Sequence, residues 1–167
     1  MANAFLLFET LVRKSPNFTE ARTEPIGGLH PFDERNIHPK VDLVSKRLYD
    51  DGHYSQSTFE AYKLLDNEVQ RISGVIQSGV KLMLQVFNEQ SPIIKFTDIN
   101  TASEKDEQQG YKFIFAGAMF AIRNPRGHEN SFEESPNQCL DHLSLASMLL
   151  RRLEAAKKSD TPGVFIA

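Results

Sequence analysis

The sequence predicts an all-α bundle of four or five helices, and three observations lead to this fold class. Apolar residues recur at spacings of three and four along several segments, as they do on one face of a helix. Glycine or proline separates these segments, and one of them opens with a capping box. No two segments form a convincing strand pair, so we expect the core to be built from helices packed on helices.

Three helices are expected between residues 36 and 88. The first covers about 36–50. The second begins at Ser55 or Ser57, since either side chain can cap it, and ends near Gly74. The third covers about 79–88, and residues 91–107 after it are expected to form a long exposed connection.

Two further helices are expected in the second half of the chain. Residues 110–123 are apolar all round, which is typical of a helix at the centre of a bundle. Gly117 lowers the helix propensity there by roughly 1 kcal/mol relative to alanine, a cost that close approach of a neighbouring helix would offset. The last helix opens at Ser135-Pro136-Asn137-Gln138, a capping box with proline at the first helical position.

The same pattern divides the chain into three parts. Residues 1–35 are interrupted by prolines and glycines and are expected to form an N-terminal accessory arm with one candidate helix. Residues 36–158 hold the bundle, and residues 159–167 form a flexible C-terminal tail.

Composition limits the classes of protein that the chain can belong to. It has 167 residues, 40% of them apolar, and its 12 phenylalanines argue against disorder. No apolar run is long enough to span a membrane, and Glu9 interrupts the short apolar patch at the N-terminus, so no membrane partner and no signal peptide are expected. Cys139 is the single cysteine, which fits a reducing compartment, and we expect a cytoplasmic protein.

Charge and ligand patterns exclude further classes. The net charge of −3 argues against coating nucleic acid through bulk electrostatics, although one or two phosphates could still be held locally. The chain has no Cys-x-x-Cys or His-Glu-x-x-His pattern, so no metal and no cofactor are expected. We therefore expect His38, His53 and His142 to be turn or packing residues.

The segment Arg123-Asn124-Pro125-Arg126-Gly127-His128 carries the candidate chemistry. Because proline disfavours the α conformation in the residue before it, the apolar helix is expected to end at about Arg123, and a turn should carry the polar groups. A guanidinium, an amide and an imidazole together could bind a phosphate and transfer a proton. Capping alone remains an alternative, since Arg and His complement the dipole at a helix C-terminus and Gly127 is an ordinary stop residue.

The pattern Arg-Asn-x-x-x-His at the end of an apolar helix resembles the signature of the HEPN superfamily. Its members are helical-bundle proteins, and many are metal-independent endoribonucleases of toxin, phage-defence and RNA-processing systems. Further blocks in the same order resemble the Ymh-type branch of bacterial and phage-associated proteins, from about Ile37 to Leu153: Ile37-His38-Pro39, Gly52-His53-Tyr54, Phe59-Glu60-Ala61, Gly79-Val80-Lys81-Leu82-Met83, Phe115-Ala116-Gly117-Ala118 and Arg123 to Glu129.

The resemblance implies a HEPN-type endoribonuclease that acts as a toxin or phage-defence effector. His128 would be the acid and base, Arg123 would stabilise the phosphate, and Asn124 would orient the site. It also implies an RNA substrate, a homodimer with a composite active site, and a cognate antitoxin or defence-system partner. The alternative is a catalytically inactive HEPN-like module for dimerisation, RNA binding or regulation.

Three further residues are candidates for supporting roles. An acidic group from an earlier helix is common in the superfamily, and Glu60 is preferred here over Asp66. Arg126 and Glu129 flank the motif and could contact phosphate or adjust His128. The alternative for all of them is an ordinary solvated surface residue.

Overall fold

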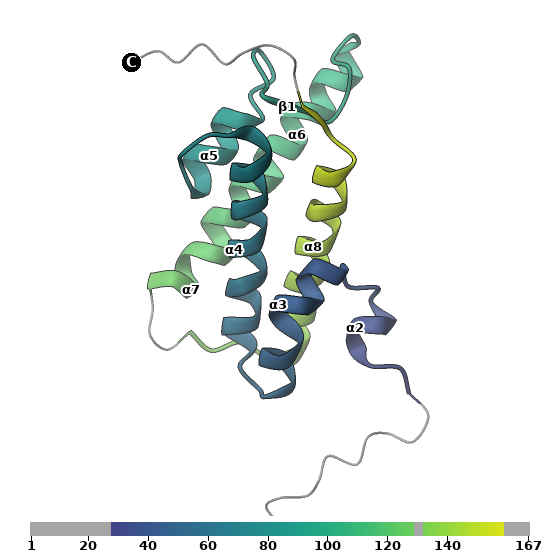
Figure 1. Ribbon diagram of the computed structural model, residues 1–167, viewed down its shortest axis with the longest axis vertical. Coiled ribbons are helices and arrows are strands. Elements are labelled where there is room, and N and C mark those ends of the chain that lie inside the picture. Colours follow the sequence, from purple (N-terminus) through teal and green to yellow (C-terminus); the bar gives the residue numbers. More distant parts are fainter. Residues whose placement is uncertain (1–27, 129–131, 159–167) are drawn as a thin grey trace, which may run out of the picture. The chain divides into compact units, whose positions relative to one another are not determined.

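The computed structural model describes residues 28–128 and 132–158 (Figure 1). The chain divides into two compact units, Met1–His30 and Pro31–Ala167. The described part of the second unit is an all-α bundle, which confirms the predicted fold class. Residues 1–27 of the expected arm and the whole expected tail, 159–167, lie outside the described residues.

The elements follow one another with short connections. In chain order the helices are α2 (Pro31–Glu34), α3 (Pro39–Asp50), α4 (Tyr54–Ser73), α5 (Gly79–Val86), α6 (Ala102–Ala118), η2 (Met119–Arg123), α7 (Asn124–His128) and α8 (Pro136–Glu154), and the two short strands are β1 (Ile94–Lys95) and β2 (Lys157–Lys158). No described helix is long and apolar enough to cross a membrane.

Helix α4 lies at the centre of the bundle. It packs against α3, α5, η2, α7 and α8, and Figure 1 shows it running between them. Ala61, Tyr62, Leu65 and Val69 recur on its inner face and are fully buried. The helix ends at Gly74, which adopts the left-handed conformation at the predicted C-cap.

The segment expected at the centre of the bundle has an exposed apolar face instead. Phe113, Ile114 and Phe120 are 56%, 42% and 71% exposed, although Phe115 and Met119 between them are fully buried. Among residues 28–128 and 132–158, a Cβ atom on Gly117 would meet nothing within 4 Å, so no helix of this part of the chain makes the expected close approach there. The prediction was wrong because an apolar pattern does not distinguish a helix that its own chain surrounds from one that keeps an exposed apolar face.

The expected exposed connection over residues 91–107 was also wrong in its second half. Helix α6 already begins at Ala102, where Thr101 and Glu104 form a capping box. The loop before it is held from inside by Gln108, a buried residue whose amide accepts from the backbone N–H of Phe96 at 2.8 Å and donates to the carbonyl of Ile94 at 3.0 Å.

A short strand pair closes this end of the bundle, which the sequence did not predict. Strands β1 and β2 are antiparallel, with Ile94 opposite Lys158 and Lys95 opposite Lys157. Each strand has only two residues, too few to show the alternation by which strands are recognised in a sequence.

The start of α8 was predicted correctly, whereas the start of α4 was not. The capping box of α8 is present as expected, with Ser135 and Gln138 exchanging hydrogen bonds. Helix α4 begins at Tyr54 with His53 at the N-cap position, two residues before Ser55 and four before Ser57, the two caps that were expected. Ser57 lies inside the helix and exchanges side-chain-to-carbonyl hydrogen bonds of 2.9 and 3.0 Å with Ser45 of α3. The small serine pair thus joins α3 to α4 where a cap had been expected.

Candidate functional site

The motif lies on a continuing helix and not on a turn after a helix end. Helix α6 passes through the π-helical turn η2 into α7, and Asn124 has helical dihedral angles of −64° and −45°. The N–H of Asn124 bonds to the carbonyl of Met119, five residues back. This wider turn relieves the clash that Pro125 would make with the carbonyl four residues before it in a regular α-helix. The predicted break at Arg123 was therefore wrong.

Arg123 is the basic residue of the motif whose guanidinium makes no ion pair within the described residues. Its side chain is half-buried, with Nη1 3.4 Å from Oδ1 of Asn124 and Cζ 5.7 Å from the ring centroid of Phe59. Its Nε is buried and has no hydrogen-bond partner. Among the described residues no carboxylate lies within ion-pair distance of this guanidinium.

Arg126 has a different role from the one expected of an exposed turn residue. Its side chain is only 3% exposed and pairs through Nε with Oε2 of Glu134 at 2.8 Å, a carboxylate that is itself 1% exposed. Its Nη1 donates to the carbonyl of Ile122 at 2.7 Å. The Arg126 guanidinium thus joins α7 to the segment before α8 and is not free to bind a phosphate.

The second oxygen of Glu134 extends this buried network. Thr58 of α4 donates to Oε1 at 3.1 Å, and Nδ1 of His142 on α8 lies 2.5 Å from the same oxygen. Since the carboxylate can only accept, Nδ1 of His142 carries the hydrogen. Burial acts to raise the pKa of Glu134, but the hydrogen bonds from His142 and Arg126 outweigh it and hold the pKa below its ordinary value. His142 is a packing residue, as expected.

The remaining motif residues are only partly placed. Helix α7 ends at His128. The side chain of His128 and all of Glu129 lie outside the described residues. That Arg123, Asn124 and His128 form one catalytic site therefore stays a prediction.

The two candidate acidic residues make contacts away from the motif. Glu60 pairs with Lys63 one turn along α4, at 3.3 Å, and no ion pair or hydrogen bond joins it to Arg123 in the described part of the chain. Asp66 is buried and accepts from the backbone N–H of Gly79 at 2.7 Å and from Gln70 at 3.1 Å. Asp66 therefore stabilises the start of α5.

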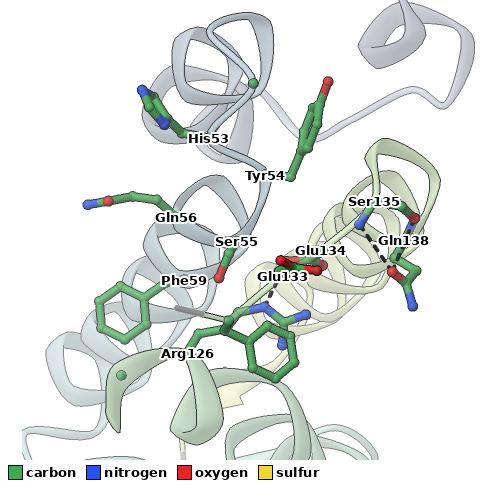
Figure 2. A pocket seen from close by; sticks show the side chains of 13 residues that line it. His53, Tyr54, Ser55, Gln56, Phe59, Arg126, Glu133, Glu134, Ser135 and Gln138 are labelled. Atoms are coloured by element: carbon green, nitrogen blue, oxygen red, sulfur yellow. Dashed lines mark hydrogen bonds and ion pairs between the residues drawn. The ribbon is translucent and has the colours of Figure 1, made fainter. Parts of the chain in front are cut away.

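A pocket of about 950 Å³ opens beside the motif, between the start of α4 and the segment that leads into α8. Figure 2 shows Gln56 and Phe59 projecting from α4 on one side, with Arg126 and Glu134 beyond them. The residues that line it are Gly52, His53, Tyr54, Ser55, Gln56, Phe59, Arg126, Gly127, Phe132, Glu133, Glu134, Ser135 and Gln138.

The comparison with protein families can now be set beside this geometry. A family model described as "Protein of unknown function (Hypoth_ymh)" matches residues 35–153. The chain belongs to the Hypoth_ymh family. The match to Hypoth_ymh runs from just before α3 to the end of α8 and includes both the motif and the Glu134 network. No curated protein and no solved structure matches the chain. The Ymh-type resemblance is confirmed, and membership of the HEPN superfamily stays a prediction.

Sequence reasoning missed two residues that organise this Hypoth_ymh site. Glu134 belongs to an acidic pair just before the capping box of α8, which has the composition of a solvated loop. Phe59 appeared only in one of the blocks of the Ymh-type resemblance, and nothing in the sequence indicates that its ring reaches the motif. Gly127 was the one available signal, because a Cβ atom there would lie 3.1 Å from the Phe59 ring.

Proposed function

We propose that this Hypoth_ymh protein is a metal-independent endoribonuclease of the HEPN type, acting as a toxin or phage-defence effector. Arg123 is the observation that carries the proposal. A buried donor without an acceptor costs about 1–3 kcal/mol, and the Nε of Arg123 is such a donor. Arg126, three residues further on, is fully paired with Glu134. A phosphate bound to the exposed part of the Arg123 guanidinium would give this cation the anionic partner that it lacks among the described residues.

The proposed chemistry is an attack by the ribose 2′-hydroxyl on the neighbouring phosphorus. The bond from O2′ to phosphorus forms, the bond from phosphorus to O5′ breaks, and the products are a 2′,3′-cyclic phosphate and a 5′-hydroxyl. One imidazole takes the proton from O2′ and another delivers a proton to O5′. We assign both proton transfers to His128 of two chains, the phosphate charge to Arg123, and the orientation of the site to Asn124.

The backbone of the motif supports a site shared by two chains. Five residues of helix turn through about 500°, so positions 123 and 128 of one chain lie about 140° apart around the axis. Positions 124 and 128 lie on one face. A second chain that meets the first near this helix end would place its own motif opposite, so that each site takes groups from both copies.

The exposed apolar face of α6 and η2 is the surface that we propose for this homodimer. It consists of Gly110, Phe113, Ile114, Gly117, Phe120 and Ala121. The sequence from Phe113 to Ile122 contains no charged residue. A two-fold interface must be complementary to itself, and large rings beside glycines with open space above them meet this requirement. Phe120 lies three residues before Arg123, so an axis near Phe120 brings the two motifs together.

A restraining partner completes the proposal, because a toxin must be held inactive in the cell that makes it. We place a cognate antitoxin or another defence-system protein in this role. Expression of the chain alone should then arrest growth, and Arg123→Ala or His128→Ala should relieve the arrest without changing the solubility of the protein.

The test of catalysis is cleavage of RNA by the purified chain in the presence of EDTA. We expect products that end in 2′,3′-cyclic phosphate or 3′-phosphate, and loss of cleavage in Arg123→Ala and in His128→Ala. Arg47→Ala is the matched control, because Arg47 lies on α3 and is almost fully exposed. Cleavage that disappears with the chelator, or that persists in His128→Ala, would contradict the mechanism.

The test of the dimer is the mass of the chain in solution. Light scattering should give twice the chain mass of 18.9 kDa. Phe120→Glu places a charge in the proposed interface and should give the monomer, whereas Leu43→Glu, on an exposed apolar residue of α3, should leave the dimer intact. A monomeric wild type, or a Phe120→Glu variant that stays dimeric, would overturn the assignment of this face.

A non-catalytic module is the second candidate function. It is favoured by Arg126, since this motif residue serves folding through its buried pair with Glu134. Such a module would bind RNA or dimerise without cleaving RNA. Absence of both RNA cleavage and growth arrest over a range of substrates, with the dimer intact, would select this function over the nuclease.

A further inference from the structure

The pocket beside α7 has walls that suit a flat ring. Three aromatic side chains line it, Tyr54 and Phe59 from α4 and Phe132 from the segment before α8. Phe59 is only half-buried, so packing holds the ring while part of it stays accessible (Figure 2). The Arg126 guanidinium lies 4.5 Å from the Phe132 ring centroid, and this cation–π contact helps to hold the ring.

Two charged groups in the pocket wall, Arg126 and Glu134, are paired with each other, and a further carboxylate, Glu133, is exposed there. Arg126 is bound to Glu134, and the second oxygen of Glu134 accepts from Thr58 and His142. The described lining contains no lysine, and His53 is its other basic residue, at the exposed start of α4. A neutral ring with polar edges matches this wall better than a phosphate does, because no unpaired arginine faces it.

Groups that can recognise the edge of such a ring stand in the first turn of α4. Neither the side chain of Ser55 nor that of Gln56 has a hydrogen-bond partner within 28–128 and 132–158, and the side chain of the N-cap residue His53 accepts no hydrogen bond from this turn. The Gln56 amide offers both a donor and an acceptor. A nucleobase edge presents the complementary pair of groups.

Phe59 connects the pocket to the motif. On one side its ring lies against Gly127 of α7, and its centroid is 5.7 Å from Cζ of Arg123. A base stacked on Phe59 would therefore lie next to the guanidinium that we assign to the phosphate. Successive groups of one RNA strand, a base and its neighbouring phosphate, fit this arrangement.

We infer that this pocket binds an unpaired nucleobase of single-stranded RNA, stacked on Phe59 and contacted at its edge by Gln56. This inference rests on the proposed function and gives that site its substrate class. A base within a duplex is covered by its neighbours and its pairing partner, so it cannot enter the pocket without leaving the stack.

The test is the binding of a single-stranded RNA oligonucleotide that contains 2-aminopurine and carries a 2′-O-methyl group on every ribose. Attack by the 2′-hydroxyl is blocked in this RNA, so binding is measured apart from cleavage. Stacking on Phe59 should quench the 2-aminopurine fluorescence. Phe59→Leu should weaken binding about tenfold and Gln56→Ala about threefold. Ile76→Ala, at an exposed apolar residue outside the pocket, should bind like the wild type.

Two controls keep the outcome interpretable. Thermal unfolding shows whether Phe59→Leu is folded, and if it is not, Gln56→Ala carries the test, because the Gln56 side chain is exposed and its removal disturbs no packing. Unchanged binding in the folded variants would overturn the inference. Equal competition by a duplex of the same sequence would overturn it too, since binding would then not require an unpaired base. Equal competition by free AMP would also overturn it, since binding would then not require an RNA strand.

The same measurements separate this inference from the proposed function. Binding of the methylated RNA by a chain that never cleaves unmodified RNA would support the base pocket and reject the proposed nuclease activity. If Phe59→Leu and Gln56→Ala leave the rate of RNA cleavage unchanged, the base pocket is rejected and the proposed nuclease activity is supported.

Discussion

Phe59 of α4 packs against Gly127 of α7 so closely that a Cβ atom at residue 127 would lie 3.1 Å from Cε2 of the ring. Glycine is therefore what allows α7, and the motif with it, to lie against α4 at this distance. In the capping alternative, Gly127 was an ordinary helix-stop residue. It lies inside α7 instead, at the contact that also positions the pocket.

Alanine at two glycines should therefore have different effects. Gly110 lies in α6 with open space around its Cβ position, so Gly110→Ala should raise the free energy of unfolding by about 0.5–1 kcal/mol through helix propensity. Gly127→Ala should lose most or all of this gain, because the Phe59 ring must move. Urea unfolding of both variants at one protein concentration measures the difference, and equal gains would contradict the close contact.

Breaking the buried pair of Arg126 and Glu134 should be costly. Glu134→Leu leaves the Arg126 guanidinium buried without its carboxylate, and we expect a loss of about 3 kcal/mol in the free energy of unfolding. Replacing both, as Arg126→Met with Glu134→Leu, should cost less than the two single changes added together. Denaturant unfolding of the three variants gives the cycle. Strict additivity would show that the two groups are not coupled.

Arg123 should show the opposite behaviour from Arg126. Arg123→Met removes a buried donor without a partner and should leave stability unchanged or raise it by up to about 1 kcal/mol, while RNA cleavage is lost. Arg126→Met should lower stability clearly. Unfolding curves and a cleavage assay on the same preparations check this prediction. A loss of stability in Arg123→Met as large as that in Arg126→Met would assign Arg123 to the fold.

Acid should remove a stabilising contribution that comes from Glu68. Hydrogen bonds from Arg71 and, against the effect of burial, from Lys40 lower the pKa of Glu68 from 4.5 to about 2. A lowered pKa in the folded state stabilises the fold above about pH 4.5, and this stabilisation disappears as the pH falls towards 2. Glu68→Gln should therefore be less stable than the wild type at pH 7, and the difference should shrink steadily as the pH falls from about 4.5 towards 2. A difference that stays constant from pH 7 to 2 would contradict the assignment.

The parts of the fold that local chemistry determines could be predicted from the sequence. The capping box at Ser135 and Gln138 and the helix stop at Gly74 are both as expected, since each depends on neighbours within four residues. The capping box at Thr101 and Glu104 was equally local, but its polar surroundings have the composition of a loop and it was overlooked.

The parts that depend on packing between distant segments could not be predicted in this way. Arg126 finds its carboxylate partner, Glu134, eight residues further along the chain, and which residues meet there depends on how α7 lies against the segment that leads into α8. The helical conformation of Asn124 depends on the wider turn before it, which overrides the usual effect of a following proline. From the sequence, the candidate site could therefore be predicted only as a motif at the end of an apolar helix, without its contacts.

The π-helical turn between α6 and α7 lets one continuous helix direct two sets of side chains toward two different groups of partners. Before it, the phase of the helix is set by burying Phe115 and Ala118 in the core. After it, the phase must bring Arg126 to Glu134 and Gly127 to Phe59. One additional residue advances the helical phase by about 100°. Deleting a single residue from this turn would make the whole segment a regular α-helix. The core residues of α6 and the motif residues of α7 could then no longer both face their partners.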